Sequence, residues 1–235
     1  MTDPQTDPTL AKLLEAALPH VAFDGWSETT FRAASEDAEI DPAMARALCP
    51  RGAVDLAVAF HAAGDAAMLR ALATADLTTL RIREKITFAV RARIEAIEDR
   101  EAVRRGTTLF ALPLYAADGA RLIWGTADAI WTAIGDTSDD VNWYTKRATL
   151  SGVYSATVLY WLGDTSAGNV DTWAFLDRRI EGVMQFEKMK AKVRETAVLK
   201  PFLAGPNWLA SQIKPPKSGG LPDLPGMFRR RGARG

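Results

Sequence analysis

The chain has 235 residues, of which 48% are apolar and 25% are charged, and 29 basic side chains balance 29 acidic ones. This length and apolar content fit one large domain or two small ones built around a hydrophobic core. One cysteine and two histidines exclude a disulfide framework, a zinc site built on cysteines and chemistry that needs several histidines.

The first fifty residues predict three short helices. Asp7 and Pro8 provide a cap and a first-turn proline for the first helix, Ser27 can cap the second, and Asp41 with Pro42 can begin the third. Residues 1–50 are therefore expected to form a three-helix unit of helix-turn-helix type.

The larger part, residues 51–200, also follows the helical period, and no stretch alternates apolar and polar residues long enough to predict a strand. We therefore expect an all-α fold whose second part is a larger helical bundle. The predicted helices cover residues 53–61, 65–72, 82–97, 101–113, 118–134, 141–162 and 171–199. The helix over residues 141–162 is apolar on several sides, so it is expected at the centre of the bundle.

The remaining residues, 201–235, form a basic tail rich in proline and glycine. Inside it, Trp208, Leu209 and Ile213 could lie on a short amphipathic helix that contacts a membrane surface. The alternative is a solvated end without fixed structure. The charge is uneven along the chain: the first fifty residues hold nine acidic and three basic side chains, and the last fifty hold three acidic and eleven basic ones.

The beginning of the chain has neither a cationic region nor an apolar run of the kind found in a secretory signal, and no later run suggests a membrane span. The expectation is an intracellular protein that does not cross the membrane.

The three-helix unit resembles the DNA-binding end of TetR-type repressors, on the residues from Leu13 to Leu18 and from Phe23 to Thr30. Phosphate contacts by Lys and Arg supply much of the affinity for DNA. Over residues 28–46 only Arg32 and Arg46 oppose five acidic side chains. We therefore expect no nucleic-acid partner, and a transcriptional regulator that responds to a ligand stays the alternative function.

A second resemblance covers residues 9 to 200. The segment from Gly135 to Arg147, the Asp164-Thr165-Ser166 turn and the segment from Asp171 to Ile180 are similar to the Coq-nine (COQ9) family of ubiquinone-biosynthesis accessory proteins. This resemblance implies a TetR-like fold, a homodimer without DNA binding, and a pocket for an isoprenoid lipid or quinone intermediate. It also implies a partner, the di-iron demethoxyubiquinone hydroxylase. No mitochondrial presequence is recognisable, so a bacterial-type cytoplasmic protein associated peripherally with the inner membrane is expected.

The resemblance implies that the hydroxylase docks near Asn142, Trp143, Tyr144 and Arg147. The family carries Arg where this chain has Lys146, and Lys is the poorer bidentate donor. From the residues alone, an exposed Trp143 beside Arg147 would be typical of an interface anchor, whereas a buried Trp143 would be ordinary core.

Aromatic and small side chains around the 141–162 helix are the candidates for lipid binding. They are Trp131, Ile134, Tyr144, Ala148, Gly152 and Leu159. The small residues would let an apolar chain approach closely, but close packing of a neighbouring helix would need them equally.

Catalysis finds little support in the sequence. His20 and His61 are far apart and neither lies in the Glu-x-x-His spacing that a di-iron helical bundle needs. We expect a protein without cofactor, metal site or catalytic residues, and an enzyme acting on lipids remains a third possibility.

Overall fold

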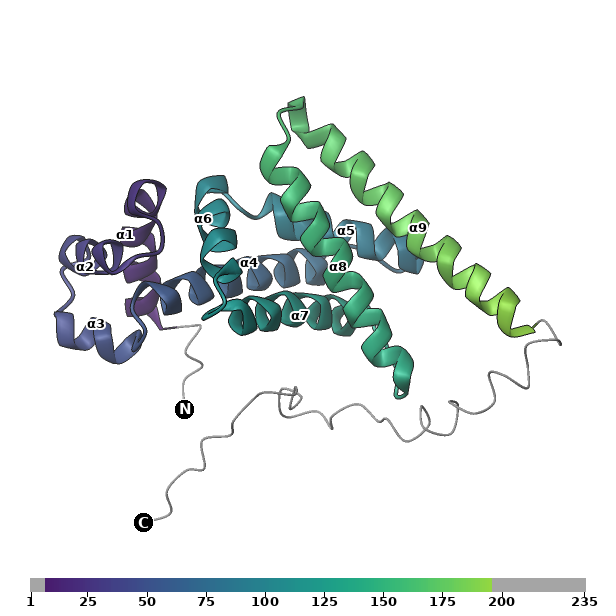
Figure 1. Cartoon of the computed structure of the whole chain (residues 1–235), viewed down its shortest axis with the longest axis horizontal. Coiled ribbons are helices and arrows are strands. Elements are labelled where there is room, and N and C mark those ends of the chain that lie inside the picture. Colours follow the sequence, from purple (N-terminus) through teal and green to yellow (C-terminus); the bar gives the residue numbers. More distant parts are fainter. Residues whose placement is uncertain (1–6, 196–235) are drawn as a thin grey trace, which may run out of the picture.

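The computed structural model describes the backbone of residues 7–195 and the side chains of residues 7–185 (Figure 1). Within this part of the chain every regular element is helical, which confirms the all-α prediction. The helices are α1 (Pro8–Asp24), α2 (Glu28–Asp37), α3 (Pro42–Leu48), α4 (Ala53–Thr74), α5 (Ile82–Glu95), α6 (Arg100–Ala111), α7 (Ala116–Ala133), α8 (Val141–Gly163) and α9 (Val170–Glu195), with a short 3-10 helix at Ala167–Asn169.

The three predicted caps begin α1, α2 and α3. The side chain of Asp7 accepts from the Thr9 amide at 2.8 Å, and Ser27 accepts from the Thr30 amide at 3.2 Å. Asp41 accepts from the amide of residue 43 at 2.9 Å. The buried faces of these helices meet in one apolar cluster, which also includes the first turns of α4.

A second apolar cluster holds α4, α5, α7, α8 and α9 together (Figure 1). Its fully buried centre includes Met68, Val90, Ile130 and Leu176, each from a different helix. Burying such side chains contributes about 1.5–3 kcal/mol each. The larger helical bundle expected after residue 50 is therefore built around this cluster.

The predicted break between residues 61 and 65 is wrong, because α4 continues without interruption from Ala53 to Thr74. Gly64, which lies in this segment of α4, has a packing role. A Cβ at Gly64 would lie 2.4 Å from Arg93 Nη1, so the missing side chain makes room for the Arg93 guanidinium.

By length and mean hydropathy α4 is also the one helix of the described part that could cross a membrane. However, its Asp55 binds Arg51, and its Asp65 binds Arg93 of α5. Because α4 belongs to both apolar clusters, we interpret it as a core helix.

The helix over residues 141–162 was expected at the centre of the bundle, where neighbouring helices would cover nearly all of it, and this is also wrong. Leu150, Tyr154 and Trp161 of α8 are buried against α7 and α9, but Leu159 is 58% exposed and Tyr160 is 39% exposed. In the single chain the neighbouring helices cover only part of the α8 surface.

Candidate functional site

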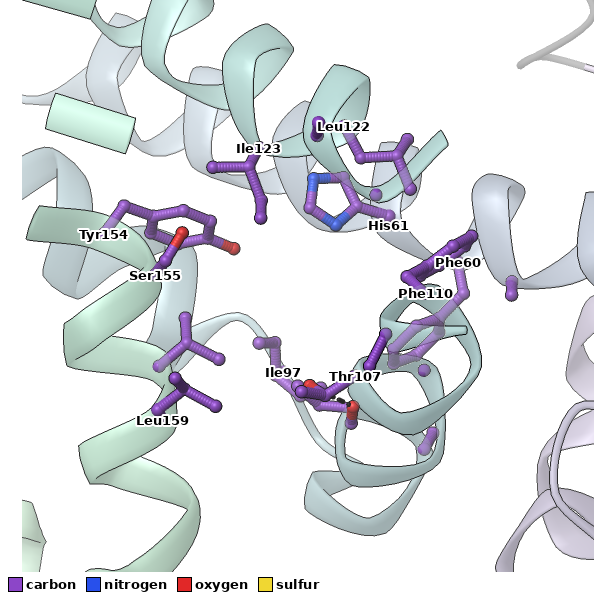
Figure 2. A pocket seen from close by; sticks show the side chains of 18 of the residues that line it. Phe60, His61, Ile97, Thr107, Phe110, Leu122, Ile123, Tyr154, Ser155 and Leu159 are labelled. Atoms are coloured by element: carbon purple, nitrogen blue, oxygen red, sulfur yellow. Dashed lines mark hydrogen bonds between the residues drawn. The ribbon is translucent and has the colours of Figure 1, made fainter. Parts of the chain in front are cut away.

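A cavity of about 390 Å³ lies between α4, α6, α7 and α8 (Figure 2). Its apolar lining includes Trp26, Ala57, Phe60, Ile97, Val103, Phe110, Leu122, Ile123, Val158 and Leu159. The volume is in the range of a small-molecule site, and such sites are mostly apolar with a few placed polar groups. We call this cavity the main pocket.

The main pocket has a closed end and an open end. At its closed end, Arg93 and Tyr154 are at most 4% exposed, and the Arg93 guanidinium lies 5.9 Å from the Tyr154 ring centroid. Leu159 of α8, Ala111 at the end of α6, and Ala116 and Ala120 of α7 also line the pocket and are exposed, and we call this exposed part the open end. An apolar chain could therefore enter between α6, α7 and α8.

Polar side chains meet at the closed end. Arg93 Nε donates to Asp65 at 2.6 Å, and its Nη2 donates to the His61 carbonyl at 3.0 Å. The Thr126 hydroxyl lies 2.9 Å from the same Asp65 carboxylate and 2.8 Å from His61 Nε2. Charge is thus balanced inside this cluster, because Asp65 neutralises Arg93.

Burial shifts the pKa of two side chains at this end. Removal from water lowers the pKa of His61 to about 4, against a smaller opposing effect of Asp65, so the imidazole is neutral at pH 7. Burial likewise raises the pKa of Tyr154 to about 12, which keeps its hydroxyl protonated.

The predicted lipid-binding residues do not share one cavity. Leu159 lines the open end of the main pocket, whereas Trp131 lines a second cavity of about 240 Å³ between α5, α8 and α9. Ile134 packs against the larger apolar cluster. Ala148 and Gly152 are exposed, and a Cβ at Gly152 would meet no atom within 4 Å, so no helix of this chain packs closely there.

Tyr144 lies in an aromatic group with two tryptophans. Its ring centroid is 4.8 Å from that of Trp143 and 6.4 Å from that of Trp124. Trp143 and Tyr144 are half-buried, and Asn142 is exposed beside the Asp140 cap. The expected docking side chains are thus gathered at the first turn of α8.

Arg147 lies beneath this group and is only 2% exposed. It donates to Asp128 at 2.5 Å and to Asp136 at 3.0 Å, and its guanidinium lies 3.9 Å from the Trp143 ring centroid. Lys146, which replaces an Arg of the family motif, donates to Asp136 at 2.7 Å. These cations lower the pKa of Asp136 to about 2 despite its desolvation. Arg147 therefore positions Trp143 and offers little surface of its own.

Sequence reasoning missed most of the main pocket. Phe60, His61, Phe110, Ile123 and Tyr154 come from four helices that are distant in sequence. One local pattern could have indicated it: His61 and Asp65 are four residues apart in an otherwise apolar helix, which places two polar side chains on one buried face.

No group of three or more His, Cys, Asp or Glu side chains that could hold a metal ion occurs among the described residues. The predicted membrane-contact residues Trp208, Leu209 and Ile213 lie outside the described residues.

Comparison with known proteins gives one family. A COQ9 family profile matches residues 116–187. The probable ubiquinone biosynthesis protein coq9 of Dictyostelium discoideum is 28% identical over 205 residues, covering 82% of this chain and 66% of the relative. COQ9-B of Xenopus laevis is 30% identical over 193 residues, covering 79% of this chain and 66% of the relative. For the COQ9 protein of Drosophila melanogaster the match covers 58% of the relative's length, so the chain spans less than two thirds of these proteins.

A solved structure supports the fold. A TetR transcriptional regulator from Nitrosomonas europaea superposes with a TM-score of 0.62 at 18% identity, over 74% of this chain and 97% of that one. At this identity the likeness concerns the fold alone.

The expected bacterial-type cytoplasmic location, peripheral to the inner membrane, is contradicted by the relatives. The proteins from Dictyostelium, Drosophila and Xenopus are all named mitochondrial. The expectation depended on the lack of a recognisable presequence, and that feature does not decide the compartment. The sequence matches and the superposition confirm the resemblance seen in the sequence: the chain belongs to the COQ9 family and has a TetR-like fold.

Proposed function

We propose that the chain is a non-catalytic lipid-binding accessory protein of ubiquinone biosynthesis, which holds an isoprenoid quinone or one of its precursors. The names of its relatives support the pathway. The observation that carries lipid binding is the main pocket, whose lining is dominated by apolar side chains and which is open beside Leu159. Each methylene that a prenyl chain buries there contributes about 0.8 kcal/mol.

The lipid is presented to the demethoxyubiquinone hydroxylase, which docks on the first turn of α8. The pocket opening at Leu159 and the docking side chains Asn142, Trp143 and Tyr144 belong to the same helix. Aromatic side chains next to a buried arginine are typical of interface anchors, and Arg147 holds Trp143 in place there.

The chain acts as a homodimer. In the single chain α8 and α9 leave Tyr160, Val170 and Met184 between 39% and 58% exposed. A second copy would remove this apolar surface from water. Light scattering on the purified protein tests this: a dimer mass is expected, and a monomer at micromolar concentration would contradict it.

Lipid extraction and native mass spectrometry of the purified chain test the main proposal. An isoprenoid lipid bound at one copy per chain is expected. Protein that binds no quinone or prenyl lipid after lipid removal and reloading would contradict it. Conversion of a quinone intermediate by the chain alone would instead favour the enzyme reading.

A ligand-responsive transcriptional regulator stays the second candidate, because the superposed protein is titled a TetR transcriptional regulator. The surface of α2 and α3 gives little support for DNA binding. Arg46, one of the two basic side chains there, already pairs with Glu28 and lies 4.5 Å from the Phe31 ring centroid. A salt-dependent gel shift with nanomolar specific binding would support this candidate.

A further inference from the structure

The closed end of the main pocket offers hydrogen bonds in an otherwise apolar space. Figure 2 shows His61 of α4 and Tyr154 of α8 directed into the cavity from different walls. The side chain of His61 is 17% exposed, and Tyr154 is 4% exposed as a residue. A ligand that fills the pocket therefore meets these two groups at its inner end.

The hydrogen bonds of His61 determine its tautomer. The carboxylate of Asp65, paired with Arg93, can only accept, so the Thr126 hydroxyl donates to it. The Thr126 oxygen must then accept from His61 Nε2 across 2.8 Å. In a neutral ring this leaves Nδ1 without a proton, as an acceptor. Figure 2 shows one ring nitrogen of His61 on the cavity side.

The Tyr154 hydroxyl is the second group, and it has no hydrogen-bond partner among the described residues. Two other hydroxyls on the pocket wall are already used inside their own helices. Ser155 Oγ donates to the Ser151 carbonyl at 2.8 Å, and Thr107 Oγ1 donates to the Val103 carbonyl at 3.0 Å. The Tyr154 hydroxyl reaches the cavity, so a ligand that displaces water from it must offer it a hydrogen bond to avoid the cost of an unpaired polar group.

The charge at this end is already balanced. Arg93 is neutralised by Asp65, and burial keeps His61 uncharged. A carboxylate or phosphate placed here would bring an uncompensated negative charge into an apolar pocket next to Asp65, which is strongly unfavourable.

We infer that the main pocket selects amphiphiles whose buried head is uncharged and carries a hydroxyl group, which donates to His61 Nδ1 and accepts from the Tyr154 hydroxyl. The apolar tail then runs outward past Leu159. This inference rests on the proposed lipid binding and adds the class of head group and the two residues that recognise it. Among the proposed ligands it favours reduced quinols and hydroxylated precursors, because an oxidised quinone ring has no hydroxyl that can donate to His61.

Three probes with one chain length test the inference on the full, delipidated chain at pH 8: dodecan-1-ol, its methyl ether and dodecanoate. Binding is followed by tryptophan fluorescence, since Trp26 lines the pocket. The alcohol is expected to bind at least tenfold more tightly than dodecanoate. The ether, which cannot donate to His61, is expected to bind about tenfold more weakly than the alcohol, as for the loss of one hydrogen bond.

The variant Tyr154→Phe keeps the ring and removes the hydroxyl, so it should weaken alcohol binding about tenfold. Ser155→Ala is the matched control, because this hydroxyl lines the same cavity but is used by its own helix; unchanged affinity is expected. If Tyr154→Phe does not fold, the affinities of the three probes for the parent chain still test the inference about the head group.

Equal affinity for all three probes, or tighter binding of dodecanoate, would overturn the inference about the head group and leave lipid binding intact. Failure of every probe and of prenyl lipids to bind would overturn the proposed function as well.

Discussion

The guanidinium group of Arg93 occupies the space that a side chain at position 64 would need: a Cβ on Gly64 would lie 2.4 Å from its Nη1. Arg93 is 3% exposed and is held by Asp65 and by the His61 carbonyl, so it cannot move aside at low cost. This contact between α4 and α5 fixes the polar end of the main pocket.

Gly64→Ala is expected to destabilise the protein, although alanine is the better helix former by about 1 kcal/mol. Overpacking against Arg93 should outweigh this gain and lower the free energy of unfolding by about 1–2 kcal/mol net. Urea unfolding measures the change. Gly125→Ala in α7 is the matched control, because a Cβ there would meet nothing within 4 Å; equal effects of the two variants would contradict the packing argument.

His61 predicts a pH dependence of stability. Burial lowers its pKa to about 4 in the folded chain from 6.5 in the unfolded one. Between these values the unfolded state takes up a proton that the folded state does not, so the free energy of unfolding falls as pH drops from 6.5 to 4, by roughly 3 kcal/mol. The pKa of Asp136 is lowered to about 2 from 3.8, so its protonation reduces the free energy of unfolding only below about pH 4.

Unfolding curves of the parent and of His61→Gln at several pH values between 4 and 7 measure this effect. The variant should lose most of the slope over that range. A slope that is the same in both proteins would assign the pH dependence to other groups.

Trp143→Ala and Tyr144→Ala are expected to weaken hydroxylase binding while changing the melting temperature by only a few degrees, since both side chains are half-buried. Arg147→Ala should behave differently. It would leave Asp136, whose side chain is 2% exposed, without one of its two cations. Breaking such a buried pair costs about 3–5 kcal/mol.

Pull-down with the hydroxylase and thermal unfolding distinguish the two effects. A large loss of helix content in Trp143→Ala would place this residue in the core. Undiminished hydroxylase binding by both aromatic variants would dismiss the docking face.

The basic tail predicts membrane association. Removal of residues 206–235, which contain Trp208, Leu209 and Ile213, should reduce co-sedimentation with anionic vesicles and leave the melting temperature of the remaining chain unchanged. Vesicles of zwitterionic lipid serve as the control. Equal sedimentation of the full and shortened chains with anionic vesicles would refute the anchor.

Local rules predicted much of the fold. The caps at Asp7, Ser27 and Asp41 act within three residues, so the sequence alone is enough to place them. The break expected near Gly64 fails for the opposite reason, because the partner that explains this glycine, Arg93, is on another helix. Glycine lowers helix propensity only modestly, and tertiary packing outweighs it.

The site was harder to predict than the fold. On α8 the pocket wall is formed by Tyr154, Ser155, Val158 and Leu159, and of the residues expected to bind lipid only Leu159 belongs to it. Helical spacing shows which residues share a face, but it does not show which face a neighbouring helix covers. Helical spacing alone does not reveal that His61 belongs to a polar cluster, because its partner Thr126 is 65 residues away.

The unbroken course of α4 has a consequence for how the molecule comes apart. Leu56 and Ala57 at its beginning belong to the apolar cluster of the three-helix unit, while Met68 and Leu72 near its end belong to the larger one. No flexible joint separates the two clusters along this helix, so neither can melt while the other keeps its full set of contacts. Heating should therefore give one cooperative calorimetric transition in place of two.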